Sequence, residues 1–155
     1  DCAMVVFGVP EEDKLHKLHA VYCAVMIQKL IERINDIRRN SNQLAVSFRI
    51  GINSGTMLAG NLGSAERMQY TVVGESVNLA SRLQHIAEEN QIVISREFYD
   101  DPDIQWRLEA KEYKSIHRRG IKEEVSTYIV TDVIALYQDK INQQIDEILR
   151  IKPAA

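Results

Sequence analysis

The sequence lacks the features that mark membrane, secreted or nucleic-acid-binding proteins. No apolar run approaches the ~20 residues of a membrane-spanning helix, and no charged and apolar leader segment opens the chain. Its two cysteines are too few for a disulfide framework and suit a reducing compartment. The 19 Lys and Arg residues nearly balance the 22 Asp and Glu residues, which gives no basic surface for nucleic acid. We therefore expect a cytoplasmic domain without a nucleic-acid partner.

The sequence does contain amphipathic elements sufficient for one domain. Its 155 residues, 45% of them hydrophobic, are long enough to bury a single core. Apolar residues spaced by three and four predict a helix over residues 14–39, with a stripe formed by Ala20, Ala24, Ile27, Ile31 and Ile34. The same spacing predicts helices over residues 76–90 and after Ile134.

Strands are predicted between these helices. Apolar composition predicts a buried strand over residues 1–9, and alternation of apolar and polar residues predicts a half-buried strand over 46–52. Shorter strands are expected over 56–59, between tight turns at neighbouring glycines, and over 70–73 and 91–95. Residues 106–116 and 125–130 predict a long hairpin. This alternation without repeats favours an α+β or α/β fold.

One polar pair on the second predicted helix suggests chemistry. Asn78 and Arg82 are four residues apart, so they lie on one helix face about a turn from each other. An amide and a guanidinium facing one cleft can orient a sugar oxygen and neutralise a phosphate. Taken alone, the pair is better explained as a surface arginine and a cap-like asparagine.

Five ordered blocks, however, resemble the class III nucleotidyl cyclases. They are DCAMVVFG from residue 1, RIGINSG from 49, AGNLGS from 59, YTVVGESVNLASR from 70 and RRGIKEEVSTY from 118. The resemblance spans residues 1–130 and implies an α+β fold with a ferredoxin-like core, in which helices flank a central, mostly antiparallel sheet. Residues 1–131 are expected to form the catalytic domain, and 132–155 a C-terminal amphipathic helix. The family's first strand and helices would precede Asp1, so we expect this stretch to be most of a domain, inactive by itself.

The resemblance also implies a reaction. ATP would be converted to 3′,5′-cyclic AMP and pyrophosphate, as the ribose 3′-hydroxyl attacks the α-phosphorus with the help of two Mg²⁺ or Mn²⁺ ions. In the family the active site lies at a dimer interface, so we expect a homodimer with shared sites. Upstream sensory or membrane domains are common in the family, and one is a possible partner here.

Six residues match functional positions of the family. The resemblance implies that Asn78 orients the ribose and that Arg82 stabilises the transition state. Thr71 would contact the purine edge, with Val72 lining the purine. Two further matches fall at the ends of the resemblance: Arg119 as a triphosphate ligand in place of the family's lysine, and Asp1 as one of two metal-binding aspartates.

Two alternatives stay open on the sequence alone. The hydroxyl of Thr71 both donates and accepts hydrogen bonds, so a guanylate cyclase that uses GTP remains possible. A catalytically inactive cyclase-like module that binds nucleotide or only dimerises is the other alternative. The presence of both Asn78 and Arg82 argues against it.

Overall fold

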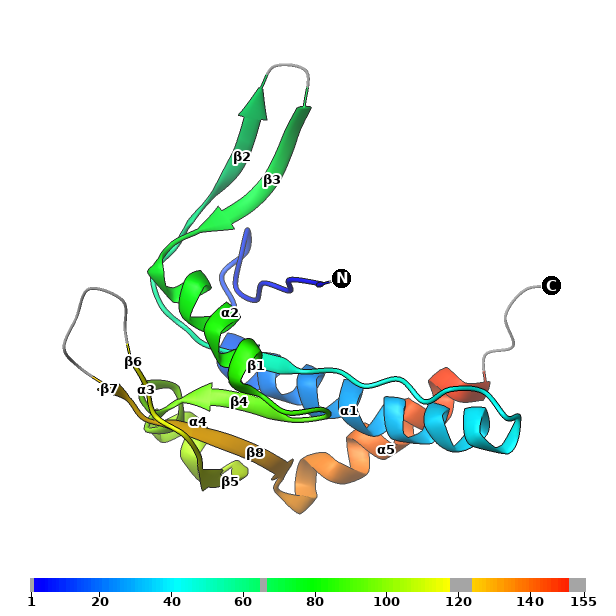
Figure 1. Ribbon diagram of the computed structural model, residues 1–155. Coiled ribbons are helices and arrows are strands. Elements are labelled where there is room, and N and C mark those ends of the chain that lie inside the picture. Colours follow the sequence, from blue (N-terminus) through cyan, green and yellow to red (C-terminus); the bar gives the residue numbers. More distant parts are fainter. Residues whose placement is uncertain (1, 65–66, 118–123, 151–155) are drawn as a thin grey trace.

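The computed structural model describes residues 2–64, 67–117 and 124–150, in which helices and strands alternate as the sequence predicts (Figure 1). In chain order the elements are α1 (His16–Asn40), β1 (Ile50–Ile52), β2 (Leu58–Ser64), β3 (Arg67–Val73), α2 (Glu75–Ile86), β4 (Ile92–Ser95), α3 (Arg96–Tyr99), α4 (Pro102–Gln105), β5 (Leu108–Glu112), β6 (Ile116–His117), β7 (Glu124–Val125), β8 (Thr127–Val133) and α5 (Ala135–Arg150). None of these helices combines the length and apolar character that crossing a bilayer requires.

A four-stranded sheet in the order β1-β4-β8-β5 forms the centre of the molecule. Strands β1 and β4 are parallel, whereas β8 pairs antiparallel with both β4 and β5. Two of the three pairings are therefore antiparallel, and the expected α+β architecture with a mostly antiparallel central sheet is confirmed.

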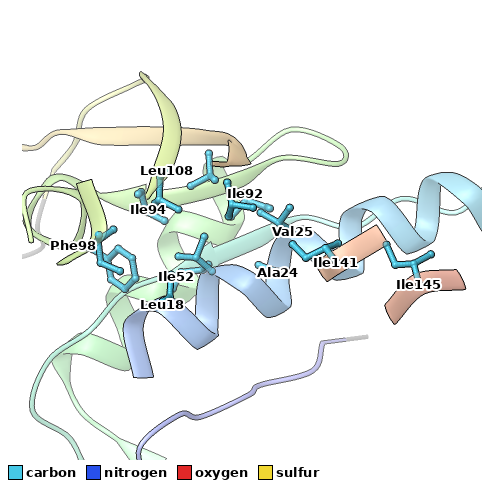
Figure 2. Close-up of a cluster of buried hydrophobic side chains, with 14 residues drawn as sticks. Leu18, Ala24, Val25, Ile52, Ile92, Ile94, Phe98, Leu108, Ile141 and Ile145 are labelled. Atoms are coloured by element: carbon cyan, nitrogen blue, oxygen red, sulfur yellow. The ribbon is translucent and has the colours of Figure 1, made fainter. Parts of the chain in front are cut away.

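Helices cover both faces of this sheet. Successive residues of a strand point to opposite faces, so one strand can contribute to the packing on both sides. On one side, Ile92 and Ile94 of β4 pack with α1 and α5 in the larger hydrophobic cluster (Figure 2). On the other side, Val93 of β4 and Ile129 of β8 pack against α2. Among the described helices, α2 is the one in this second cluster, which Tyr113 and Ile116 complete.

Helix α1 matches the predicted span closely. The residues that it buries, however, are mostly not those of the predicted apolar stripe. Its buried apolar residues are Leu18, Val21, Ala24 and Val25, of which only Ala24 belongs to the predicted stripe. Ile27, Ile31 and Ile34 are half-buried, and Ile31 lines a small surface pocket with Phe48. The C-terminal half of α1 extends past the sheet (Figure 1). There Arg33 pairs with Asp146 of α5, and Asn35 bonds to the connecting segment at Val46.

The predicted strand over residues 1–9 is wrong for the described residues 2–9. They form no strand, and Met4 and Val5 are 55% and 63% exposed. A strand requires a hydrogen-bonded neighbour, and no backbone hydrogen bond joins residues 2–9 to another strand within the described chain.

The strand predicted over residues 46–52 is shorter than expected, because its first half is bonded at Val46 by Asn35 and at Phe48 by Asn90 rather than by a strand. The Asn35 amide of α1 donates to the Val46 carbonyl (2.7 Å) and accepts from the Val46 N–H (2.8 Å). Asn35 is only 6% exposed. It therefore serves as the partner of the Val46 backbone, and pairing with β4 begins only at Ile50.

Strands β2 and β3 form an antiparallel hairpin that projects from the body of the protein (Figure 1). The sequence predicted a shorter strand here, with turns at the glycines. Gly60 and Gly63 instead lie within β2, where Gly60 pairs with Thr71. A Cβ at Gly60 would meet no described atom within 4 Å, so close packing does not require a glycine at this position of β2. We call β2 and β3 together the β-arm.

The C-terminal part follows the prediction. Strand β5 pairs with β8, and β6 pairs with β7, which together form the expected hairpin. Helix α5 follows β8 and packs on α1, with Ile141 and Ile145 fully buried in the main core (Figure 2). The short helices α3 and α4 between β4 and β5 were not predicted.

Candidate active site

Asn78 and Arg82 lie on α2, one turn apart, as their spacing predicts. The stripe that α2 buries against the sheet contains Leu79 and Leu83, each one position further along the chain. Since successive helical residues are about 100° apart around the axis, the Asn78 and Arg82 pair faces sideways from this buried stripe. Asn78 is exposed and Arg82 is half-buried.

Neither side chain has a polar partner in the described part of the chain. Across the described residues, Asn78 and Arg82 make no side-chain hydrogen bond and no ion pair. An arginine without a carboxylate partner keeps all its donors for a ligand. The pair is therefore free to bind an oxygen-rich anion.

Close backbone packing fixes where α2 lies on the sheet. A Cβ at Gly51 of β1 would stand 2.2 Å from the Ala80 carbonyl oxygen and 2.3 Å from the Gln84 backbone nitrogen. Only glycine allows the helix backbone to approach β1 this closely. Gly51 thus allows the close packing of α2 on β1.

Polar groups hold the N-terminus of α2. Its N-cap residue is Gly74, so no side chain caps the helix. The amide Nδ2 of Asn53 donates to the Ser76 carbonyl at 3.2 Å, and the Asn53 Oδ1 accepts from Ser95 Oγ at 2.8 Å. The Ser76 hydroxyl donates to the Thr56 carbonyl at 3.4 Å.

Asn53 and Ser95 were missed by the sequence analysis. Each lies at the carboxyl end of one of two parallel strands, β1 and β4, with Ile52 paired to Ile94. Polar residues at the carboxyl ends of adjacent parallel strands meet at one sheet edge, which is a common position for binding sites. Recognising β1 and β4 as parallel neighbours would have revealed the pair.

The residues predicted to contact the purine lie on β3, immediately before α2. Thr71 is half-buried and Val72 is 6% exposed. As neighbours in a strand, they point to opposite faces of the β-arm. Contact of either residue with a nucleotide stays a prediction.

Two predicted site residues, Asp1 and Arg119, lie outside the described residues. Within residues 2–64, 67–117 and 124–150, no three His, Cys, Asp or Glu side chains are grouped closely enough to hold a metal ion. The described side chains therefore do not by themselves fit a two-metal centre, and the metal prediction depends on Asp1 together with carboxylates beyond this set.

Comparison with known proteins assigns the family. The family model described as the adenylate and guanylate cyclase catalytic domain matches residues 1–132. The chain belongs to this family.

Both kinds of cyclase occur among the relatives. Adenylate cyclase 1 of Rhizobium meliloti is 37% identical over 84 residues, which cover 54% of this chain and 13% of that protein. The crystal structure of the guanylyl cyclase Cya2 has a TM-score of 0.74 at 30% identity, covering 84% of this chain and 66% of that one. The adenylyl cyclase CyaB of P. aeruginosa has a TM-score of 0.73 at 31% identity, covering 81% and 65%.

The matches cover only part of each relative. This chain spans a small fraction of the curated cyclases that it matches, and just under two thirds of the solved cyclase chains. Guanylyl cyclase domains among the solved relatives occur as a dimer and as a monomer.

Proposed function

We propose that this domain forms the catalytic part of an adenylate cyclase, which converts ATP to 3′,5′-cyclic AMP and pyrophosphate. The observation that carries the proposal is the arrangement of Asn78 and Arg82. They lie one turn apart on α2, beside its buried stripe and without polar partners in the described structure, in a chain of the cyclase family.

The chemistry of the pair suits this reaction. The transferred phosphorus carries charge on its equatorial oxygens, so catalysis depends mainly on positioning and charge stabilisation. Arg82 would donate to the α-phosphate oxygens as the 3′-hydroxyl attacks in line and pyrophosphate leaves. Asn78 would hold the ribose through its amide, which fixes the direction of attack.

We propose ATP rather than GTP as the substrate because of Thr71. The family resemblance associates Asp, Thr or Ser at this position with adenine and Cys with guanine. A threonine hydroxyl is able to accept from the adenine amino group. The relatives include both adenylate and guanylate cyclases, so a guanylate cyclase is the second candidate.

We propose Asp1 as a metal ligand and Arg119 as a triphosphate ligand. Two bound Mg²⁺ or Mn²⁺ ions would offset phosphate charge and make the attacking hydroxyl more acidic. Arg119 would add a bidentate contact to the leaving pyrophosphate.

We further propose that the active unit is a homodimer with shared sites. The β-arm exposes Leu58, Tyr70 and Val73, with 75%, 55% and 43% of their surface accessible. Leu58 and Val73 pair across the hairpin and share one face, whereas Tyr70 points to the other. Exposed apolar side chains on a projecting hairpin favour burial against a second surface. A second copy of the chain would supply it.

The test uses the intact protein that carries this domain, assayed with Mn²⁺ and either ATP or GTP. We expect cyclic AMP from ATP and little product from GTP. Preferred use of GTP would assign a guanylate cyclase instead, and nucleotide binding without turnover of either would assign an inactive module.

Mixing two inactive variants tests the shared site. If Asp1 and Arg82 of one site come from different protomers, Asp1→Ala and Arg82→Ala proteins each lose activity, yet their heterodimer contains one intact site. With random exchange, the mixture should recover about a quarter of the wild-type rate. No recovery in a mixture shown to contain heterodimers would contradict shared sites.

A further inference from the structure

A directed chain of hydrogen bonds runs from α3 to the first turn of α2. The Phe98 N–H donates to Ser95 Oγ at 3.2 Å, and the Ser95 hydroxyl donates to Asn53 Oδ1 at 2.8 Å. The Asn53 Nδ2 then donates to the Ser76 carbonyl at 3.2 Å. Ser95 is fully buried, so water does not compete at this step of the chain.

The direction of this chain fixes the orientation of the Asn53 amide. A backbone N–H only donates, so the Ser95 oxygen accepts from Phe98 and its own proton turns to Asn53. The Asn53 oxygen must then face Ser95, which leaves its NH₂ group facing α2. An amide held at both ends has one favourable rotamer.

The contact is made at the first turn of α2. Gly74 at the N-cap offers no side chain, so the first turn lacks the usual capping bond. Asn53 contacts the carbonyl of Ser76, two residues before Asn78. The loop beside it also packs tightly, because a Cβ at Gly55 would stand 2.1 Å from Ser76 Oγ.

We propose that Asn53, oriented by Ser95, is a positioning residue for the cyclase reaction. It holds the first turn of α2 against the ends of β1 and β4, so that Asn78 and Arg82 meet the ribose and the phosphate in the reactive geometry. This inference rests on the proposed function. Asn53 acts through α2, and small displacements of reacting groups are costly in rate even when binding survives.

The test is Asn53→Asp in the intact protein, because aspartate keeps the shape and the acceptor for Ser95 but loses the donor to Ser76. We expect kcat to fall at least tenfold, while the KM for the nucleotide changes less than about threefold. Asn142→Asp is the matched control, since Asn142 lies on α5 with no side-chain hydrogen bond in the described chain. The control should retain wild-type kcat.

A purely structural role gives a different result. In that case Asn53→Asp lowers the unfolding temperature but leaves kcat unchanged at temperatures where the protein stays folded, and the proposal is overturned. If Asn53→Asp does not fold, Ser95→Ala replaces it, because this change releases the orientation of the Asn53 amide. A wild-type kcat in Ser95→Ala overturns the proposal as well.

Arg82→Ala, measured beside these variants, separates the two hypotheses. Loss of turnover in Arg82→Ala with full turnover in Asn53→Asp refutes only the positioning role. Full turnover in Arg82→Ala refutes the proposed function on which that role rests.

Discussion

Gly51 of β1 and Ala80 of α2 are in such close contact that a methyl group on the glycine would stand 2.2 Å from the alanine carbonyl oxygen. Both partners are backbone, so no side-chain rotation relieves the overlap. This contact sets the distance between the sheet and the helix that carries Asn78 and Arg82.

Gly51→Ala should therefore destabilise the protein and displace the site. Overpacking of this kind costs roughly 1–3 kcal/mol, and the helix must move away to accommodate the methyl group. Urea unfolding measures the loss, and cyclase activity should fall with it. Gly60→Ala is the control, because a Cβ at Gly60 meets no atom within 4 Å, so its stability should stay within about 0.5 kcal/mol of wild type. Equal stability of the two variants would contradict the close packing of α2 on β1.

Asn35→Ala should cost about 1–3 kcal/mol of unfolding free energy. The substitution removes both hydrogen bonds to Val46 and leaves the N–H and the carbonyl of that residue without their partner. Chemical denaturation of the variant measures the cost. Asn142→Ala on α5 serves for comparison and should cost less than about 0.5 kcal/mol. Similar losses for both would show that Asn35 does not act as a backbone partner.

The pair Lys17 and Asp101 links α1 to the turn before α4 and predicts a pH dependence. The hydrogen bond from Lys17 lowers the pKa of the Asp101 carboxyl. A lowered pKa means that the unfolded chain binds this proton more tightly, so the stabilisation is present above about pH 4 and is lost as pH falls through the folded-state pKa.

Lys17→Met should accordingly reduce stability by about 0.2–1 kcal/mol at pH 7. The difference from wild type should shrink as the pH falls below about 4 and through the lowered pKa of Asp101, because protonation of the carboxyl removes the ion pair. Unfolding free energies measured across this range test the sign. Lys140→Met on α5, which breaks no ion pair among the described residues, should show no such trend. A stability difference that grows on acidification would be inconsistent with the pair.

Thr71→Cys should weaken the preference for ATP. Cysteine is a poorer hydrogen-bonding group than threonine, and the family resemblance associates it with guanine. If one hydrogen bond of about 1 kcal/mol is lost with ATP, the ratio of kcat/KM for ATP to that for GTP falls roughly fivefold. Thr131→Cys, on the distant strand β8, should leave the ratio unchanged. An unchanged ratio in Thr71→Cys would remove Thr71 from purine recognition.

The sequence predicted those features that depend on local pattern. The span of α1, the single-turn spacing of Asn78 and Arg82, and the hairpin of β5 and β8 all follow from periodicity. The five motif blocks were sufficient to identify the family, which the family model then confirmed.

Features that depend on tertiary partners were not predictable in this way. The β propensity of residues 46–49 does not reveal that the Asn35 side chain bonds the Val46 backbone in place of a neighbouring strand. The composition of residues 2–9 does not show whether a strand lies beside them. Asn53 and Ser95 became recognisable as a pair only when β1 and β4 were known to be parallel neighbours.

The most direct test of the central claim is the rate of cyclic AMP formation by Arg82→Ala in the intact protein with Mn²⁺ and ATP. If Arg82 stabilises the transition state, kcat should fall by about 10²–10³ while the unfolding transition matches wild type. Arg150→Ala, near the end of α5, should keep the wild-type rate. A folded Arg82→Ala protein that forms cyclic AMP at the wild-type rate would contradict the proposed active site.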